Sequence, residues 1–531
     1  MRLFKNAPAA GVITWAVAAA LVFSFAMVPT AGARSRRSGG GKLSARLAGR
    51  SLNMTFKSKI DGSLQPLLIK VPDGYTPEKK WPLLVTLHGL GAPPLLANEV
   101  TSMVQIGPYG RGPVWYTGIG AQDVFEAVDA AKKLFPIDED RMYLCGFSMG
   151  GAGTFDIGLR YPDLWAACVP ICGRCDDLNL VENGRHVGFW IHTGGQDDIL
   201  PPVYSVKAYE RSRSLGFERW RYSEHEKMDH SFDIDWKQVE RWLSTQSKVS
   251  NPKHVSLTLK DLKANTAYWV EVTGLGRYGL HGRIDAGIAG QTINVKTNNI
   301  SAYTLRLNNE LVNLARKVEI RENDSTVFKG LLDGGRFDGG RKGKGGPVKR
   351  PGLCGPLWEI YGSPCILVYG TGGGNDSLVN AAKSCAEAFK DPQWMAKVSF
   401  KIIPDAALKS EELADNNLVL FGNASTNKIL ARISDKLPAQ LRANTVIAGG
   451  KEYSGRNIGY VLIYPNPLNS EKYVAVFAGN TGEAINCFNR IWPQLTATPN
   501  AIDVGVFEVS EDDSVRWRLA GIFGTNWDWQ Y

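Results

Sequence analysis

The sequence feature that most constrains the fold is the pentapeptide Gly-Phe-Ser-Met-Gly at residues 146–150. It follows a short apolar run at 142–145 and opens a helical segment that stops before Pro162. A serine on a sharp turn between a buried strand and a helix needs glycine on both sides, because a side chain there would collide with neighbouring backbone. The pattern predicts an α/β fold with Ser148 at the carboxyl edge of a mostly parallel sheet.

Apolar runs and helical segments alternate on both sides of this turn. We expect strands at 65–71, 81–87, 142–146, 165–171, 187–192 and 219–223, and helices at 120–135, 150–160, 204–215 and 234–245. The strand segments are largely apolar rather than alternating, which is typical of strands buried on both faces. The sequence therefore predicts a sheet with helices on both faces.

A chain of 531 residues is long enough for several domains. Short alternating strands separated by polar turns follow the first α/β region and predict a small β-sandwich. A Gly-rich basic stretch comes next, and then strand–helix alternation returns. The expected organisation is a signal peptide (1–33), a basic disordered leader (34–51), an α/β domain (52–250), a β-rich module (251–330), a Gly/basic linker (331–352) and a C-terminal α/β domain (353–531).

The N-terminus has the pattern of a secretory signal. An apolar run at 7–28 follows Arg2 and Lys5, and the small residues Ala-Gly-Ala at 31–33 form a cleavage pattern. An uncleaved anchor is the alternative, because the apolar run is longer than usual. Either interpretation predicts a secreted or periplasmic, envelope-located protein.

The net charge of +9 is concentrated in segments that we expect to be unfolded. Residues 1–33 carry +2, residues 34–50 carry +6 and residues 330–352 carry +4, so the rest of the chain nets −3. The basic leader is suited to contact an anionic envelope. The folded surface gives no reason to expect nucleic acid as a partner.

Eight cysteines permit disulfides in an exported protein. Three of them, Cys168, Cys172 and Cys175, lie close together but without a nearby histidine cluster, so we expect a local disulfide or buried thiols and no metal site. The Gly-rich turn at 369–375 resembles a dinucleotide loop, but Asn375 stands where its last glycine would fall. We therefore expect a tight strand-to-helix turn, and no cofactor.

A serine hydroxyl becomes a nucleophile only when a base removes its proton, and that base needs an orienting acid. Asp197 lies 49 residues beyond Ser148, directly after an apolar strand, and His230 lies 33 residues further. Each of the three falls in a loop after a predicted strand, so all should meet at one sheet edge. We predict Ser148 as nucleophile, His230 as base and Asp197 as the orienting acid.

Two neighbours compete for these roles. Asp198 is adjacent to Asp197, although the spacing of Asp197 from Leu200 and Pro201 favours the first acid. His225 precedes His230 by five residues and is expected at a strand end.

An oxyanion intermediate requires two backbone N–H donors. One is expected from Met149, directly after the nucleophile. The other is expected from Leu90, or Gly89, in the loop after the strand at 81–87. In a purely structural interpretation, His88-Gly89 is only a strand-to-loop turn.

Residues 65–245 resemble α/β-hydrolases of the secreted-esterase and prolyl-oligopeptidase type. The matching blocks are WPLLVTLHGLG at 81–91, DEDRMYLCGFSMGG at 138–151, and the loops of Asp197 and His230. The resemblance implies a serine hydrolase acting on small-molecule or polymer esters, or on peptides. About 15 residues separate the leader from the first core strand, which leaves no room for the N-terminal propeller of the peptidases.

The sequence therefore favours an exported serine carboxylesterase that works through an acyl-enzyme. The alternatives are a serine peptidase of the prolyl-oligopeptidase type and a non-catalytic envelope or glycan-binding protein on a hydrolase scaffold.

Overall fold

The computed structural model describes residues 45–97, 99–340, 347–391, 398–488, 490–491 and 502–530. The predicted signal peptide and most of the basic leader lie outside these residues. Within the described ranges, no helix combines the length and the apolar character that crossing a bilayer requires.

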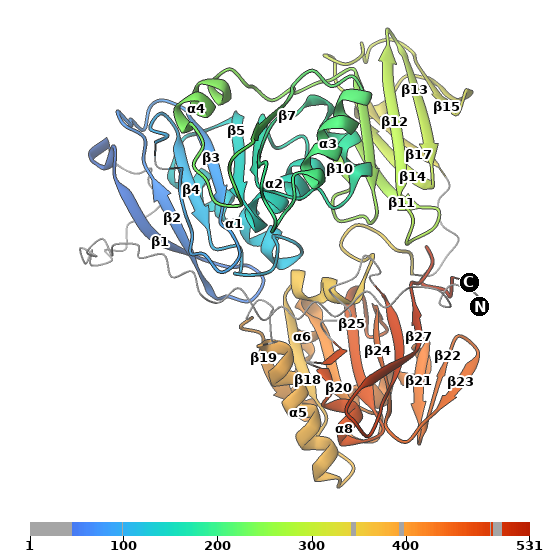
Figure 1. Ribbon diagram of the computed structural model, residues 1–531. Helices are drawn as coiled ribbons and strands as arrows, with labels where there is room; N and C mark the ends of the chain where they lie inside the picture. The colour runs from blue at the N-terminus through green and yellow to red at the C-terminus, as the bar shows by residue number, and fades with distance from the viewer. Residues whose placement is uncertain are drawn as a thin grey trace. The chain divides into compact units, whose positions relative to one another are not determined.

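The first domain is built on an eight-stranded sheet with the order β1-β2-β4-β3-β5-β6-β7-β8 (Figure 1). Neighbouring strands from β4 to β8 are parallel, whereas β2 is antiparallel to β1 and β4. The carboxyl ends of β3, β5, β6, β7 and β8 therefore meet at one edge. The strands are β1 (Ser51–Lys57), β2 (Leu64–Lys70), β3 (Trp81–Leu87), β4 (Val104–Pro108), β5 (Ile137–Phe147), β6 (Ala167–Ile171), β7 (Gly188–Gly194) and β8 (Trp220–His225).

Helices cover both faces of this sheet, as the apolar strands predict. The helices are α1 (Ile119–Leu134), α2 (Met149–Arg160), α3 (Val203–Ser214) and α4 (Trp236–Ser244). Alternate residues of one strand enter different cores: Leu83 and Val85 of β3 pack in one, and Leu84 packs with Val239 of α4 in the other. The predicted fold class is confirmed, and the helices begin within two residues of their predicted starts.

The end of the predicted leader is ordered. Leu47 packs against the first core, and the Val71 N–H donates to the Arg50 carbonyl at 2.9 Å. Because this bond continues the pairing of β1 with β2, the prediction of a disordered leader is wrong for residues 45–51.

The β-rich region forms two sheets, ordered β10-β11-β14-β17 and β16-β15-β13-β12-β9. The strands are β9 (His254–Leu259), β10 (Thr266–Ala267), β11 (Val270–Leu275), β12 (Gly282–Ala289), β13 (Thr292–Asn298), β14 (Ile300–Arg306), β15 (Val318–Glu322), β16 (Ser325–Gly330) and β17 (Arg336–Gly340).

Strand β17 corrects the predicted linker at 331–352. It pairs antiparallel with β14, so residues 336–340 belong to the β-rich region. Its glycines serve close packing rather than flexibility: a Cβ on Gly339 would lie 2.3 Å from Cζ of Tyr303.

The α/β domain is joined to β9 through the 3₁₀ segment Leu178–His186. The buried Asn183 amide donates to the Thr258 carbonyl at 2.9 Å, and its oxygen accepts the Thr258 N–H at 2.7 Å. Glu182 accepts from Arg283 at 2.9 Å and from Arg211 at 2.7 Å. The Asn183 side chain therefore satisfies backbone groups of the edge strand β9 that another strand would otherwise pair.

The C-terminal region contains a seven-stranded sheet ordered β19-β18-β20-β25-β24-β26-β27 and a three-stranded sheet of β21 to β23. The four strands from β19 to β25 are parallel neighbours, and the others are antiparallel. Its elements are β18 (Cys365–Tyr369), α5 (Asp376–Lys390), β19 (Lys401–Pro404), α6 (Ser410–Asp415), β20 (Asn417–Gly422), α7 (Lys428–Ile433), β21 (Ala439–Arg442), β22 (Thr445–Ala448), β23 (Lys451–Ser454), β24 (Ile458–Asn466), β25 (Asn469–Gly479), α8 (Gly482–Ile485), β26 (Val504–Val509) and β27 (Val515–Gly521).

In the Gly-rich turn after β18, Gly370 and Gly372 lie close to the backbone of Thr426. The Gly372 N–H donates to the Thr426 carbonyl at 2.8 Å, and a Cβ on Gly370 would lie 2.6 Å from the Thr426 carbonyl carbon. These contacts fit the expected strand-to-helix turn.

Candidate active site

Ser148 occupies the turn between β5 and α2 in a strained conformation. Its φ and ψ are 57° and −116°, a region that L-residues rarely adopt. Its N–H donates to the Ile171 carbonyl of β6 at 2.9 Å, and its carbonyl accepts the Ala152 N–H at 3.0 Å. Because backbone bonds from a strand and a helix hold the turn, the Ser148 side chain is presented at the sheet edge.

The two glycines of the pentapeptide are required by close approach. A Cβ on Gly146 would lie 2.4 Å from the Gly150 carbonyl oxygen, and a Cβ on Gly150 would lie 2.1 Å from the Leu87 carbonyl oxygen. These distances agree with the sequence argument that no side chain fits at either position.

The structure brings Ser148, His230 and Asp197 together. Nε2 of His230 lies 2.8 Å from Oγ of Ser148, and Nδ1 lies 2.7 Å from Oδ2 of Asp197. The His230 side chain is 12% exposed, and the Phe147 ring packs against it with centroids 5.2 Å apart. The three groups form a continuous chain of hydroxyl, imidazole and carboxylate, which has the geometry that a catalytic triad requires, and we refer to them as the triad.

These observations decide the fold family. The serine stands on a strand-to-helix elbow, and the acid and the histidine follow in chain order along one sheet edge. The domain has the α/β-hydrolase fold.

Asp197 of this α/β-hydrolase domain is held by its own loop. Its Oδ1 accepts the N–H groups of Ile199 at 3.0 Å and Leu200 at 2.8 Å, which leaves Oδ2 for His230. Asp197 is buried, whereas Asp198 is exposed. Of the two candidate acids, Asp197 is the one that contacts His230.

His225 takes no part in this chain of hydrogen bonds. It ends β8, and its Nε2 lies 3.2 Å from Nδ1 of His192 in β7. Its carbonyl accepts the N–H groups of Gly195 and Met228, both at 2.9 Å. His225 thus links the loop of Asp197 to the loop of His230.

The buried His192 predicts a loss of stability in acid. Its Nε2 has no hydrogen-bond partner among the described residues, and burial, with a smaller contribution from His225, lowers its pKa to about 3. In the unfolded chain a histidine has a pKa near 6.5. The unfolded state therefore binds the proton more readily, and stability falls as the pH drops from about 6.5 towards 3.

We expect His192→Gln to weaken this dependence. Between pH 6.5 and pH 5, protonation of the unfolded His192 costs the wild type on the order of 2 kcal/mol. Urea unfolding of both proteins at pH 7 and pH 5 measures the change, because the other titrating groups contribute equally to each. The prediction would be contradicted if the free energies of unfolding of the two proteins differed by the same amount at pH 7 and at pH 5.

Cys172 is a neighbour of the triad that sequence reasoning missed. The described cysteines are all buried and unbridged, so the expectation of a disulfide is wrong and that of buried thiols holds. Cys172 has a φ of 45° and follows β6 at the same sheet edge as the triad loops. Its position directly after a predicted strand is the one sequence signal that could have found it. Burial raises the pKa of its thiol to about 12, and the Asp197 charge adds to this, so Cys172 is a protonated neighbour of that carboxylate.

Cys172, Asp197 and His230 each place one potential metal-ligand atom within 4.8 Å of the others. The Asp197 carboxylate and the His230 ring are already joined by a hydrogen bond, and the thiol is protonated. Cysteine binds a metal ion as the thiolate, so a site here would have to release the thiol proton and break the contact between His230 and Asp197. The donor set therefore fits a hydrogen-bonded triad better than a metal site.

One of the two predicted oxyanion donors directly follows Ser148, and the other belongs to a turn that runs beside it. Met149 is the first residue of α2, where the backbone N–H has no partner within the helix. Leu90 lies in the turn after β3. A Cβ on the preceding Gly89 would lie 3.6 Å from Cβ of Ser148, so this turn runs beside the serine.

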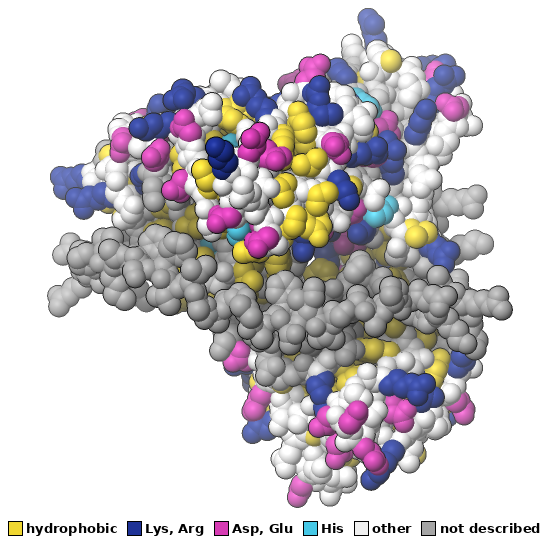
Figure 2. Space-filling model, in the orientation of Figure 1, with side chains coloured by type: hydrophobic (Ala, Val, Ile, Leu, Met, Phe, Trp, Pro, Cys, Tyr) yellow, Lys and Arg dark blue, Asp and Glu magenta, His cyan; other side chains and the backbone are white. Residues whose placement is uncertain are grey.

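Three exposed apolar side chains belong to the loops that carry these residues. Leu90, Ile199 and Met228 are 52%, 64% and 47% exposed. The Met228 carbonyl accepts the Gln196 N–H at 2.9 Å, which brings the Ile199 and Met228 loops together. Charged side chains of both signs are interspersed on the face of the molecule in Figure 2.

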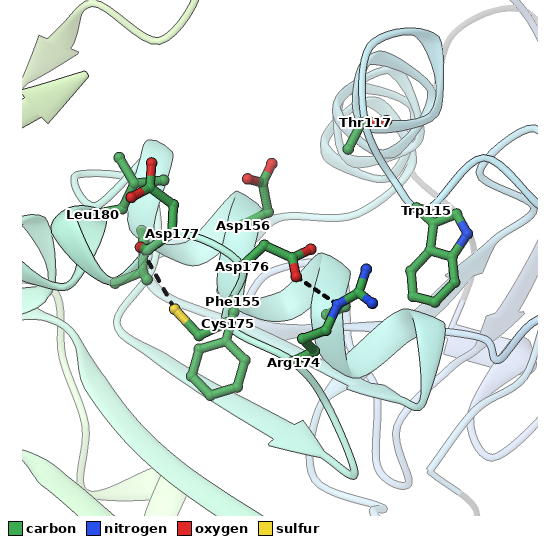
Figure 3. Close-up of a pocket in the computed structure, with 11 residues that line it drawn as sticks. Trp115, Thr117, Phe155, Asp156, Arg174, Cys175, Asp176, Asp177 and Leu180 are labelled. Atoms are coloured by element: carbon green, nitrogen blue, oxygen red, sulfur yellow. Dashed lines mark hydrogen bonds and ion pairs between the residues drawn. The ribbon is translucent and has the colours of Figure 1, made fainter. Parts of the chain in front are cut away.

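A small pocket lies away from the triad, on α2 and the loop after β6 (Figure 3). It holds about 50 Å³ and is lined by Trp115, Asp156, Arg174 and Asp176, among others. Arg174 lies 2.5 Å from Asp176 and stacks over the Trp115 ring at 4.9 Å. None of its lining residues belongs to the triad.

Comparisons with known proteins give partial matches. No family model matches the chain. A bifunctional acetylxylan esterase/xylanase of Neocallimastix patriciarum is 28% identical over 152 residues, which are 26% of this chain and 22% of that protein. A thermostable esterase structure is 24% identical with a TM-score of 0.33, covering 38% of this chain and 64% of that one.

A ferulic acid esterase of Anaeromyces mucronatus, solved with ferulic acid, is 18% identical with a TM-score of 0.32, covering 37% of this chain and 90% of that one. The chain thus spans about a fifth of the curated relative and less than two thirds of the thermostable esterase.

Proposed function

We propose that this protein is an exported serine esterase that hydrolyses carboxylic esters through an acyl-enzyme. The observation that carries the proposal is the hydrogen-bonded chain from Ser148 through His230 to Asp197, with contacts of 2.8 and 2.7 Å. The acetylxylan esterase named above supports an ester as the substrate.

In the proposed reaction, Oγ of Ser148 attacks the ester carbonyl carbon while Nε2 of His230 takes the hydroxyl proton. Asp197 keeps Nδ1 of His230 protonated and stabilises the imidazolium. The N–H groups of Met149 and Leu90 donate to the oxyanion. His230 then gives its proton to the departing alcohol, and a water activated by His230 releases the acid from Ser148.

The exposed apolar side chains of Leu90, Ile199 and Met228 support an ester with an apolar portion beside the reacting carbonyl. Export is supported by the apolar run at 7–28 and the Ala-Gly-Ala pattern behind it. The basic residues of 34–50 support contact with an anionic envelope. The net charge of −3 on the rest of the chain gives no support for nucleic acid as a partner.

Turnover of nitrophenyl acetate, nitrophenyl butyrate and peptide nitroanilides tests the proposal. We expect ester hydrolysis, with butyrate at least as good a substrate as acetate, and little anilide cleavage. Treatment with a fluorophosphonate should label the protein and abolish the activity.

Faster cleavage of the anilides would instead favour the peptidase. A folded protein with neither labelling nor turnover would favour a non-catalytic binding protein.

A further inference from the structure

His88 follows β3 directly and is buried, yet both of its ring nitrogens have polar partners. Nδ1 lies 2.8 Å from the carbonyl oxygen of Gly89, and Nε2 lies 2.8 Å from the carbonyl oxygen of Tyr109. The ring is stacked with Tyr109 at 5.9 Å and meets the edge of Tyr116 at 5.6 Å. The imidazole is therefore fixed in place between two loops at the active-site edge of the sheet.

The contact with Gly89 fixes the orientation of a peptide plane. A carbonyl oxygen only accepts, so each of the two contacts is a hydrogen bond when the ring nitrogen that faces the carbonyl carries a proton, which for Gly89 is Nδ1. The Gly89 carbonyl also accepts the Ala92 N–H at 3.1 Å. Rotation of the Gly89–Leu90 peptide would break both contacts of this carbonyl.

In a trans peptide the C=O and the following N–H point in opposite directions. The peptide whose carbonyl is held by His88 carries the Leu90 N–H, the second donor of the proposed oxyanion site. The Leu90 N–H must therefore point away from the His88 ring. The Gly89 position runs beside the elbow, since a Cβ there would lie 3.6 Å from Cβ of Ser148 and 3.5 Å from the Phe147 ring.

We propose that His88 is a positioning residue, which holds the Gly89–Leu90 peptide so that the Leu90 N–H faces the oxyanion of the reacting ester. The inference rests on the proposed function, because it assigns a role within that reaction. It predicts that His88 acts on the transition state and hardly affects binding of the substrate before reaction.

Three substitutions of His88 distinguish the contribution of the Nδ1 contact with Gly89 from that of the Nε2 contact with Tyr109. Asparagine places its amide nitrogen near the position of Nδ1, glutamine reaches towards the position of Nε2, and phenylalanine keeps a ring without a donor. We expect His88→Phe and His88→Gln to lower kcat for nitrophenyl acetate roughly 10- to 100-fold, towards the loss measured when an oxyanion donor is removed. KM should change little, and His88→Asn should retain most of the activity.

Inhibition by phenylboronic acid provides a second readout, because its tetrahedral adduct with serine places an oxygen in the oxyanion site. Its affinity should fall in parallel with kcat for His88→Phe, while the affinity for the product acid stays within about twofold. His186→Phe is the matched control, since His186 also contacts a carbonyl, that of His254 at 2.6 Å, but lies outside the triad loops.

Equal kcat values for His88→Asn and His88→Gln would overturn the inference, and this comparison decides the question even if His88→Phe does not fold. Parallel losses of boronate and product binding would also overturn it. A wild-type protein without ester turnover would instead refute the proposed function.

Discussion

Replacing Ser148 with alanine should lower kcat for nitrophenyl acetate by about 10⁴-fold or more, because the substitution removes the only atom that forms the acyl-enzyme. Fluorophosphonate labelling should disappear with it. The fold should survive, since the bonds that hold this turn, to Ile171 and Ala152, are made by backbone groups. Steady-state turnover, labelling and a thermal unfolding curve of the same preparation measure all three expectations.

Ser231→Ala is the matched control. Ser231 is exposed and adjacent to His230, so its loss tests whether any change to a serine near the site has an effect. A Ser148→Ala variant that keeps more than a tenth of the wild-type kcat would contradict the assignment of the nucleophile.

Replacing Gly150 with alanine should destabilise the α/β domain by about 3 kcal/mol or more. The new methyl group would lie 2.1 Å from the Leu87 carbonyl oxygen, so the α2 N-terminus and β3 would have to separate. The expected decrease in the free energy of unfolding is informative, because replacing glycine with alanine inside a helix otherwise stabilises a protein by roughly 1 kcal/mol. Urea unfolding followed by tryptophan fluorescence measures the change.

Gly362→Ala serves as the control for this substitution, since a Cβ at Gly362 would meet no atom within 4 Å and its φ is not in the left-handed region. We expect it to change the free energy of unfolding little. A Gly150→Ala protein as stable as the wild type would show that the turn can open without cost.

Much of the α/β domain follows from local sequence. Strands β3, β6 and β7 are buried along their whole length and the helices have regular spacing, so these elements could be predicted together with the loops that carry Ser148, Asp197 and His230. Strands β1 and β4 were not predicted. The spacing from Leu200 and Pro201 favoured Asp197 over Asp198, but the physical reason for this choice is seen only in the structure. The hydrogen bonds from Ile199 and Leu200 turn Asp197 inward.

Contacts between distant segments could not be predicted in this way. Strand β17 was not predicted because its glycines resemble a flexible linker, and the Tyr303 ring and the Ser301 carbonyl explain why glycine stands at 339 and 340. The contact of His88 with the Tyr109 carbonyl joins residues 21 positions apart in the sequence. The approach of the Cys172 thiol to Asp197 depends on the positive φ of Cys172, which is unusual for a non-glycine residue.

The pairing of Asn183 with Thr258 has a consequence for how the protein unfolds. If the β-rich sheets opened while the α/β domain stayed folded, a buried amide and the carboxylate of Glu182 would lose their partners in β9 and β12. Opened in this way, these groups would exchange their protein partners for water, at a net cost of roughly 0.5–1.5 kcal/mol for each neutral hydrogen bond and 1.5–3 kcal/mol for the one to a charged group. We therefore expect the two regions to unfold together, so that the chain near residue 250 marks a change of architecture rather than a boundary between independently unfolding parts.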